Sequence, residues 1–299
     1  MDENELDGTV SWRELVAETE GRLQRSGVVA DARVETRWIV EDILGATGAE
    51  YHHLLDSLAT VRGVAKLDRM VDRRVEGEPI QYVLGHWAFR SLDLLLDRRV
   101  LIPRPETEVV AGLAMEELRR ANPDGGVAVD LGTGSGAIGL SIAVECPGAS
   151  VVLTDASDDA LAVARANLAG IGMAAATVEI HAGSWFEAVP DRLRGAIDVI
   201  VSNPPYVTDG ADLSSDVADW EPASALRAGD DGLDDLRVIV AEAADWLQPD
   251  GAVVLEMDPE QTGPLVELAA LDGWTGSVHR DLAGRDRSVV LRRAEPAAD

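Results

Sequence analysis

The residues with the most specific chemistry are the tetrapeptide Asn203-Pro204-Pro205-Tyr206. The side-chain oxygen of Asn203 and the backbone carbonyl of Pro204 are two hydrogen-bond acceptors on one stiff segment. Together they can hold both hydrogens of an amide or exocyclic amine and draw its nitrogen toward tetrahedral geometry. The nitrogen lone pair is then less delocalised and better oriented for attack. Pro205 stiffens the loop further, and Tyr206 offers a ring face for a flat amide or base.

A glycine-rich turn, made of Gly132, Thr133, Gly134, Ser135 and Gly136, is the second group of interest. It follows the apolar segment Val127–Leu131 and precedes a helical pattern. Glycines let backbone pass close to a ligand, and the free amides of a helix start favour electron-rich groups. Asp155, at the end of the next strand pattern, can accept both hydroxyls of a ribose. The combination suits S-adenosylmethionine and NAD equally, with a plain connector and a helix cap as the alternative.

The strand pattern Ile197–Ser202 decides between these nucleotides, because the tetrapeptide follows it at once. Ligands of such sheets bind beyond the carboxyl ends of the strands, so the tetrapeptide and the glycine-rich turn are predicted to face one crevice. A simple turn is the alternative for the tetrapeptide. An amine-holding loop beside a nucleotide predicts methyl transfer from S-adenosylmethionine, without a metal or a covalent intermediate.

The elements that must position these residues alternate between strand and helix from residue 105 onward. Such alternation predicts a mostly parallel sheet covered on both faces. The strand candidates are Val127–Leu131, Val151–Thr154, Thr177–His181, Ile197–Ser202, Ala252–Met257, Trp274–His279 and Ser288–Leu291. The segment between the last two is too short for a helical crossover, so that pair is predicted to be antiparallel. The expected fold class is α/β, a Rossmann-like sheet as in S-adenosylmethionine-dependent methyltransferases.

The first 78 residues show helical spacing and no strand-like alternation, which predicts a small helical-bundle domain over 1–78. Ser11 and Glu14 fit a capping box. Asp31 can cap a second helix and Gly45 can stop it. The side chains expected to face inward from this second helix are Val34, Trp38, Ile39 and Ile43 or Leu44. Residues 79–104 are predicted to form a linker with a β-hairpin, and 105–299 the methyltransferase domain.

Composition narrows the class of substrate. The 299-residue chain has 54 acidic and 26 basic residues and a net charge of −28, so it repels phosphate backbones overall. Arg98, Arg99 and Arg104 could still form a local basic patch. No apolar run is long enough to span a membrane and the acidic start is unlike a secretory signal, so a cytoplasmic protein is expected. The single cysteine, Cys146, excludes an internal disulfide and a multi-cysteine zinc site, and is expected to be buried.

The motifs resemble those of the HemK/PrmC family, the protein-(glutamine) methyltransferases that modify class I peptide chain release factors. Further segments carry the resemblance in the same order: Gly77–Gly85, Leu101–Glu108, Ser184–Phe186 and Ala283–Arg287. The Asn-Pro-Pro-Tyr motif alone is shared with adenine methyltransferases of DNA. Its combination with Pro103–Glu108 is much more specific.

The resemblance implies methyl transfer from S-adenosylmethionine to the side-chain amide nitrogen of the glutamine in the release factor's Gly-Gly-Gln motif. It places S-adenosylmethionine on Gly132 to Gly136, Asp155, Trp185 and Asn203. It places the glutamine on Asn203 to Tyr206, with Asn203, Pro204 and Tyr206 in catalysis and with Phe89 and Arg104 nearby. The N-terminal helices would dock the release factor. The enzyme is expected to act as a monomer, without a membrane and without direct nucleic-acid contact.

Two departures from the family pattern stand out. Ser184 occupies a position where the family often has an acid, and Met257-Asp258 follows Glu256 where the family often has Ile-Gly. Neither is expected to touch the acceptor loop. The alternative functions are methylation of adenine or guanine amines in nucleic acid, a nucleotide-binding regulatory module without catalysis, and, more distantly, a NAD dehydrogenase.

Overall fold

The computed structural model describes residues 7–294, which divide into two compact units. The N-terminal unit comprises the described residues up to His86 together with Ser214–Trp220. The catalytic unit comprises Trp87–Leu213 together with the described residues from Glu221 onward. The domain limits predicted from the sequence, at 78 and 104, stay a prediction.

The N-terminal unit is mainly helical, as predicted. Its helices are α1 (Trp12–Ser26), α2 (Ala32–Leu44), α3 (Gly48–Leu54), α4 (Val61–Val75) and α5 (Ile80–Leu84). The predicted absence of strands was wrong, because β1 (Asp7–Ser11) and β2 (Leu58–Thr60) form a short antiparallel pair. Ser11 forms the predicted capping box with Glu14, and the Asp31 carboxylate accepts from the Val34 amide at 3.0 Å.

The buried face of α2 differs from the prediction. Val34 and Trp38 are each 37% exposed, whereas Glu35 is buried beside Ile39. Glu35 Oε2 accepts a hydrogen bond of 2.6 Å from Nε of Arg74 on α4, and both side chains are largely shielded from water. Hydrophobic spacing assigns a glutamate to the solvent side, so it could not anticipate a helix face built around an ion pair.

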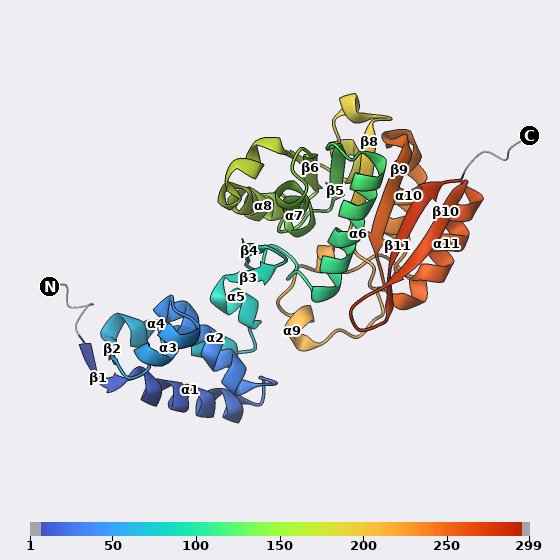
Figure 1. The fold of residues 1–299 in the computed structure, drawn as a ribbon. Coiled ribbons are helices and arrows are strands. Elements are labelled where there is room, and N and C mark those ends of the chain that lie inside the picture. The colour runs from blue at the N-terminus through green and yellow to red at the C-terminus, as the bar shows by residue number, and fades with distance from the viewer. Residues whose placement is uncertain (1–6, 295–299) are drawn as a thin grey trace, which may run out of the picture. The chain divides into compact units, whose positions relative to one another are not determined.

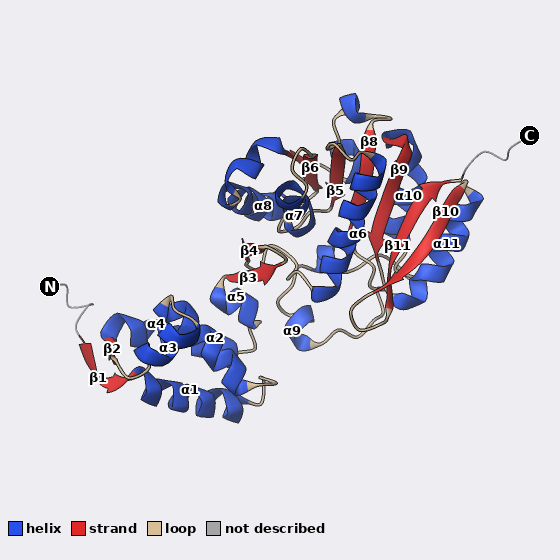
Figure 2. Ribbon diagram, in the orientation of Figure 1, coloured by secondary structure: helices blue, strands red, loops and turns tan. Residues whose placement is uncertain are grey.

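The catalytic unit contains a seven-stranded sheet of order β10-β11-β9-β8-β5-β6-β7 (Figure 2). The strands are β5 (Val127–Leu131), β6 (Ser150–Asp155), β7 (Val178–Ala182), β8 (Ile197–Ser202), β9 (Leu247–Glu256), β10 (Trp274–Arg280) and β11 (Asp286–Arg293). The pairs β7–β6, β6–β5, β5–β8 and β8–β9 are all parallel. Strand β11 is antiparallel to both β9 and β10, which confirms the predicted final pair.

Helices cover both faces of this sheet. They are α6 (Pro105–Ala121), α7 (Ala137–Glu145), α8 (Asp158–Gly170), α10 (Asp234–Trp246) and α11 (Thr262–Leu271). Figure 1 shows α6 across one face and α10 and α11 on the opposite face. Pro105 occupies the first position of α6, as predicted. The predicted hairpin is present as β3 (His86–Phe89) and β4 (Leu92–Leu95), and the short helix α9 (Ser215–Ala218) follows the tetrapeptide.

Strand order fixes where a ligand can bind. From β5 the chain continues to β6 and β7 on one side, and then returns to β8 and β9 on the other. The carboxyl ends of β5, β6 and β8 therefore border a crevice at the point where strand order reverses. Strand β8 is buried along its whole length, which explains its apolar residues at 197 and 199–201. Cys146 is buried, as predicted, and within residues 7–294 no helix combines the length and apolar character that crossing a membrane requires.

Candidate active site

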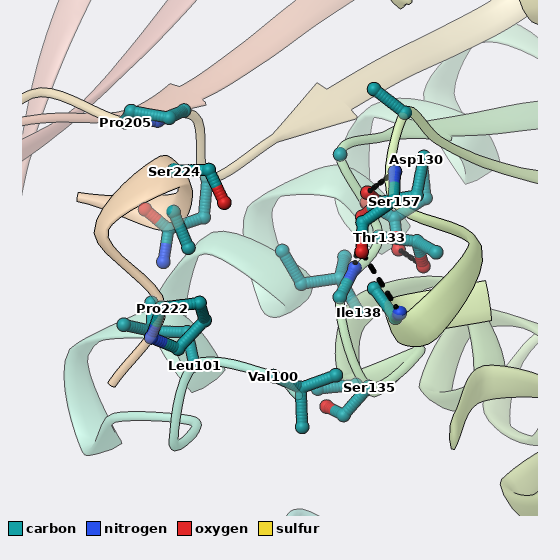
Figure 3. A pocket seen from close by; sticks show the side chains of 18 of the residues that line it. Val100, Leu101, Asp130, Thr133, Ser135, Ile138, Ser157, Pro205, Pro222 and Ser224 are labelled. Atoms are coloured by element: carbon teal, nitrogen blue, oxygen red, sulfur yellow. Dashed lines mark hydrogen bonds between the residues drawn. The ribbon is translucent and has the colours of Figure 1, made fainter. Parts of the chain in front are cut away.

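A cavity of about 480 Å³ opens at the carboxyl ends of β5, β6 and β8. Most of the predicted site residues line it: Gly132, Thr133, Gly134, Ser135, Asp155, Trp185, Asn203 and Pro205. Figure 3 shows Thr133 and Ser135 on one side of the cavity and Pro205, Pro222 and Ser224 on the other. The structure thus brings the glycine-rich turn and the acceptor loop to one cavity, whose volume lies in the range of small-molecule sites.

The carboxylate of Asp155 is held at the edge of this cavity by backbone amides. Its Oδ2 accepts from the Gly134 N–H and its Oδ1 from the Ser157 N–H, each at 2.9 Å. Burial raises the pKa of Asp155, and hydrogen bonds from backbone amides oppose that rise. Each oxygen keeps a further lone pair, so the group can accept two ligand hydroxyls without moving.

Gly136 does not line the cavity, although it was predicted among the nucleotide-binding residues. It caps α7 with φ of +87°, a conformation that favours glycine, and its amide donates to the Thr133 carbonyl at 2.8 Å. A Cβ at this position would lie 2.7 Å from Leu140 Cδ1. The contribution of Gly136 in this structure is therefore to close the turn rather than to face the cavity.

Pro204 and Tyr206 do not line the cavity either. Pro204 is buried, and Gln261 Nε2 donates to the Tyr206 backbone carbonyl at 2.9 Å. Burial, and then the neighbouring charge of Glu256, raise the pKa of the Tyr206 phenol. The phenol therefore stays protonated at neutral pH, which excludes it as a general base. The predicted substrate contacts of Pro204 and Tyr206 stay a prediction.

Asp258 makes no hydrogen bond to the acceptor loop itself, but it is linked to that loop through Gln261. Asp258 caps the short 3-10 helix η6 (Pro259–Gln261), and its backbone N–H donates to Oε1 of Gln261 at 3.0 Å. The amide nitrogen of Gln261 is thereby turned toward the carbonyls of Tyr206 and Asp231, to which it donates at 2.9 and 3.1 Å. The end of β9 thus supports the loop that begins at Asn203.

The side chain of Asn203 is anchored on one side only. Its Nδ2 donates to the hydroxyl of Thr107, on the first turn of α6, at 3.4 Å. Among the described residues no group donates to its Oδ1. The β8 end itself is fixed by Ser202, whose hydroxyl donates to the Leu131 carbonyl at 2.6 Å. Asn203 therefore presents a hydrogen-bond acceptor at the cavity from a rigid strand end.

Trp185 adopts a strained backbone. Its φ of +45° lies in the left-handed region, which a bulky residue rarely occupies. Its ring lies so close to Gly132 that a Cβ there would come within 3.4 Å of it. Asp235 of α10 also lines the cavity; burial raises the pKa of its carboxyl, and a hydrogen bond from Trp185 opposes this. Sequence reasoning missed Asp235, because it saw only a charged residue at a helix start.

Arg104 and Phe89, implied to lie nearby, are not among the cavity residues. Arg104 forms an ion pair with Glu221, which is 5% exposed and also accepts from the Ile102 N–H at 3.3 Å. This pairing attaches the loop after the tetrapeptide to the segment before α6. Phe89 is buried in the core. Among residues 7–294 no group of His, Cys, Asp or Glu side chains is arranged to hold a metal ion.

Asp130, near the end of β5, lines the cavity, although it was not among the predicted site residues. Its Oδ2 accepts from the Thr133 hydroxyl at 2.7 Å and from the Gly139 amide at 2.9 Å. This single oxygen ties the glycine-rich turn to the first turn of α7. Burial raises the pKa of Asp130 to about 6.

The raised pKa of Asp130 predicts a stability effect with a definite sign. The folded protein binds the proton of the Asp130 carboxyl more tightly than the unfolded chain does. The contribution of this proton to the free energy of unfolding is therefore fully present below about pH 4 and is lost as pH rises through about 6. Asp130→Asn keeps an oxygen for both hydrogen bonds but cannot ionise. Urea unfolding should show that the free energy of unfolding of the variant, relative to that of the parent, increases between about pH 4 and pH 7, by about 3 kcal/mol at most. A difference that does not change with pH would contradict the assignment.

Both units contain segments that match known protein families. Residues 109–220 match the family described as methyltransferase small domain, and residues 14–85 match the PrmC N-terminal domain. A curated relative from Agrobacterium fabrum, named release factor glutamine methyltransferase, is 37% identical over 292 residues, which cover 96% of this chain and 98% of the relative. A relative of the same name from Deinococcus radiodurans is 38% identical over 284 residues, 94% of this chain and 98% of its own.

Solved structures support the fold. A methyltransferase from Pyrococcus furiosus is similar with a TM-score of 0.51 and 22% identity, and the match covers 68% of this chain and 89% of that one. Such a likeness bears on the arrangement of the sheet and its helices, and not on the substrate.

Proposed function

Because the chain belongs to the release factor glutamine methyltransferase family, we propose that it methylates the side-chain amide nitrogen of a glutamine in class I peptide chain release factors. The reacting residue is the glutamine of the Gly-Gly-Gln motif. The observation that carries the proposal is one cavity bordered by both a glycine-rich turn and the amide-accepting Asn203. The methyltransferase fold and domain imply the use of S-adenosylmethionine.

The cavity residues fit S-adenosylmethionine, which when bound supplies a methyl group on a positively charged sulfur. Asp155, held by two backbone amides, would accept the ribose hydroxyls. Gly132 and Gly134 have positive φ and no side chain, so the backbone can approach the ligand closely. Trp185, which lines the same cavity, would supply an apolar wall.

The acceptor loop would act by positioning the glutamine. An amide nitrogen is a weak nucleophile because its lone pair is delocalised into the carbonyl. Asn203 Oδ1 and the Pro204 carbonyl would each accept one of its hydrogens and hold the nitrogen in line for attack. Tyr206 would pack against the amide as a neutral phenol. Because these acceptors are fixed before the substrate arrives, little reorganisation is needed in the transition state.

The N-terminal unit would bind the release factor, and the enzyme would act as a monomer. The match of residues 14–85 to the PrmC N-terminal domain supports a family-specific role for this unit. Nucleic acid is disfavoured as substrate by the net charge of −28. Arg99 pairs with Asp97 at 2.6 Å and Arg104 pairs with Glu221, so two of the three arginines considered for a basic patch are neutralised by acidic partners.

The test is incubation of the purified protein with labelled S-adenosylmethionine and a class I release factor, followed by mapping of the label by mass spectrometry. We expect a single methyl group on the glutamine of the Gly-Gly-Gln motif. A factor with that glutamine changed to alanine is the matched control and should stay unlabelled. Label on RNA or DNA, with none on the factor, would overturn the substrate and leave the fold unaffected.

A further inference from the structure

The carboxyl group of Glu256 is buried at the end of β9, next to the acceptor loop. Strands β8 and β9 are parallel with Ser202 opposite Leu255, so Asn203 and Glu256 leave their strands side by side. Glu256 has no exposed surface, and neither carboxyl oxygen has a hydrogen-bond partner among the described residues. A buried, poorly supported carboxyl beside a reacting site is costly to keep, which suggests that it has a role there.

Thr107 links this carboxyl to Asn203. It lies 3% exposed on the first turn of α6 and accepts the hydrogen bond from Asn203 Nδ2. Burial raises the pKa of Glu256 to about 7, and the strongest influence that lowers this pKa comes from the nearby Thr107 hydroxyl. A threonine hydroxyl has one hydrogen and two lone pairs. Because Thr107 accepts from Asn203, its own hydrogen is available to the Glu256 carboxyl.

We propose that Glu256 is a positioning residue, which acts through Thr107 to keep the Asn203 amide turned with Oδ1 toward the glutamine; this rests on the proposed function. An ionised carboxylate can only accept hydrogen bonds, so Thr107 must donate to it and accept from Asn203. Only Nδ2 of Asn203 can donate, which leaves Oδ1 for the substrate. A protonated carboxyl can instead donate to Thr107, whose hydrogen is then free to bind Oδ1 and permit the opposite orientation.

The groups around Glu256 place its ionisation near neutral pH. Glu106 on α6 raises the pKa of Glu256, whereas Arg287 on β11 and Arg104 before α6 lower it, after burial and Thr107. The charge of Glu256 in turn raises the pKa of the phenol of Tyr206, in the acceptor loop. The rate of methyl transfer should therefore rise with an apparent pKa of about 7, as the carboxyl ionises and fixes Asn203.

The experiment compares single-turnover rates and steady-state constants at several pH values for three variants. Thr107→Val keeps the shape but removes the hydroxyl, Thr107→Ser restores the hydroxyl, and Glu256→Gln removes the ionisation. We expect Thr107→Val and Glu256→Gln to lower kcat about tenfold with little change in KM, and Thr107→Ser to regain most of the loss. Glu256→Gln should also lose the rise in rate near pH 7.

The matched control is Asp198→Asn, because Asp198 is a buried carboxylate on β8 that accepts from the Val127 amide, away from the acceptor loop. It should leave kcat and the pH profile unchanged even if the melting temperature falls. Unchanged kcat and pH profile in both Thr107→Val and Glu256→Gln would overturn the proposal.

A readout independent of activity separates this proposal from the proposed function. The side-chain NH₂ resonances of Asn203, followed by NMR, should shift near pH 7 in the parent and stay constant in Glu256→Gln. If the parent labels no release factor, the substrate assignment fails, while this titration still decides whether Glu256 positions Asn203. Resonances that do not respond to pH in the parent would overturn the positioning role.

Discussion

Asn203→Ala should lose methyl transfer by about a thousandfold while it still binds S-adenosylmethionine, since one fixed acceptor on a reacting group is worth about that much. Among the described residues the side chain of Asn203 makes one hydrogen bond, to Thr107, so truncation removes an acceptor from the cavity without opening the core. Single-turnover labelling gives the rate, and equilibrium titration gives the affinity for S-adenosylmethionine.

The matched control for this variant is Asn122→Ala. Asn122 follows α6 and is not among the cavity residues, so its truncation should leave the rate unchanged. A rate for Asn203→Ala within about threefold of the parent would rule out the proposed role of the acceptor loop, because removal of a preorganised group that holds the reacting atoms costs at least about a hundredfold.

Asp155→Ala should weaken binding of S-adenosylmethionine by about a thousandfold, through loss of two hydrogen bonds to a charged acceptor. At saturating S-adenosylmethionine the rate of transfer should recover most of its value, because Asp155 ends β6 and is not part of the acceptor loop. Calorimetric titration measures the affinity, and the rate is followed as the donor concentration is raised.

The control for Asp155→Ala is Asp158→Ala, three positions further on at the start of α8 and outside the cavity lining. It removes the same charge from the same segment, so it separates the loss of contacts from the loss of net charge. Equal affinities for the parent and Asp155→Ala would exclude the carboxylate as the ribose acceptor.

The site residues that could be predicted from the sequence are those whose positions follow from the local pattern of strands and turns. Asn203 and Asp155 follow apolar strands directly, and parallel strands bring their carboxyl ends to one edge of the sheet. Knowing where β6 and β8 end was therefore enough to predict that both residues face the same cavity.

The parts that could not be predicted depend on contacts between distant segments. Thr107 meets Asn203 across a separation of 96 residues, and Glu221 meets Arg104 across 117. Neither pairing leaves a periodic signal, because each joins a loop or helix start to a residue elsewhere in the fold. The buried face of α2 was misjudged for the same reason, since its ion pair with Arg74 joins residues 39 apart.

The N-terminal unit is built from two separate segments of the chain, and this has a consequence for the order in which the protein can fold during synthesis. Ser214–Trp220 belong to that unit, and a Cβ on Gly77 would lie 3.8 Å from the indole nitrogen of Trp220. The chain therefore crosses between the units three times, after His86, Leu213 and Trp220. On the ribosome the first helices emerge early, but their unit is complete only once Trp220 has been synthesised. Expression of residues 1–86 alone would produce a bundle that lacks one of its own segments.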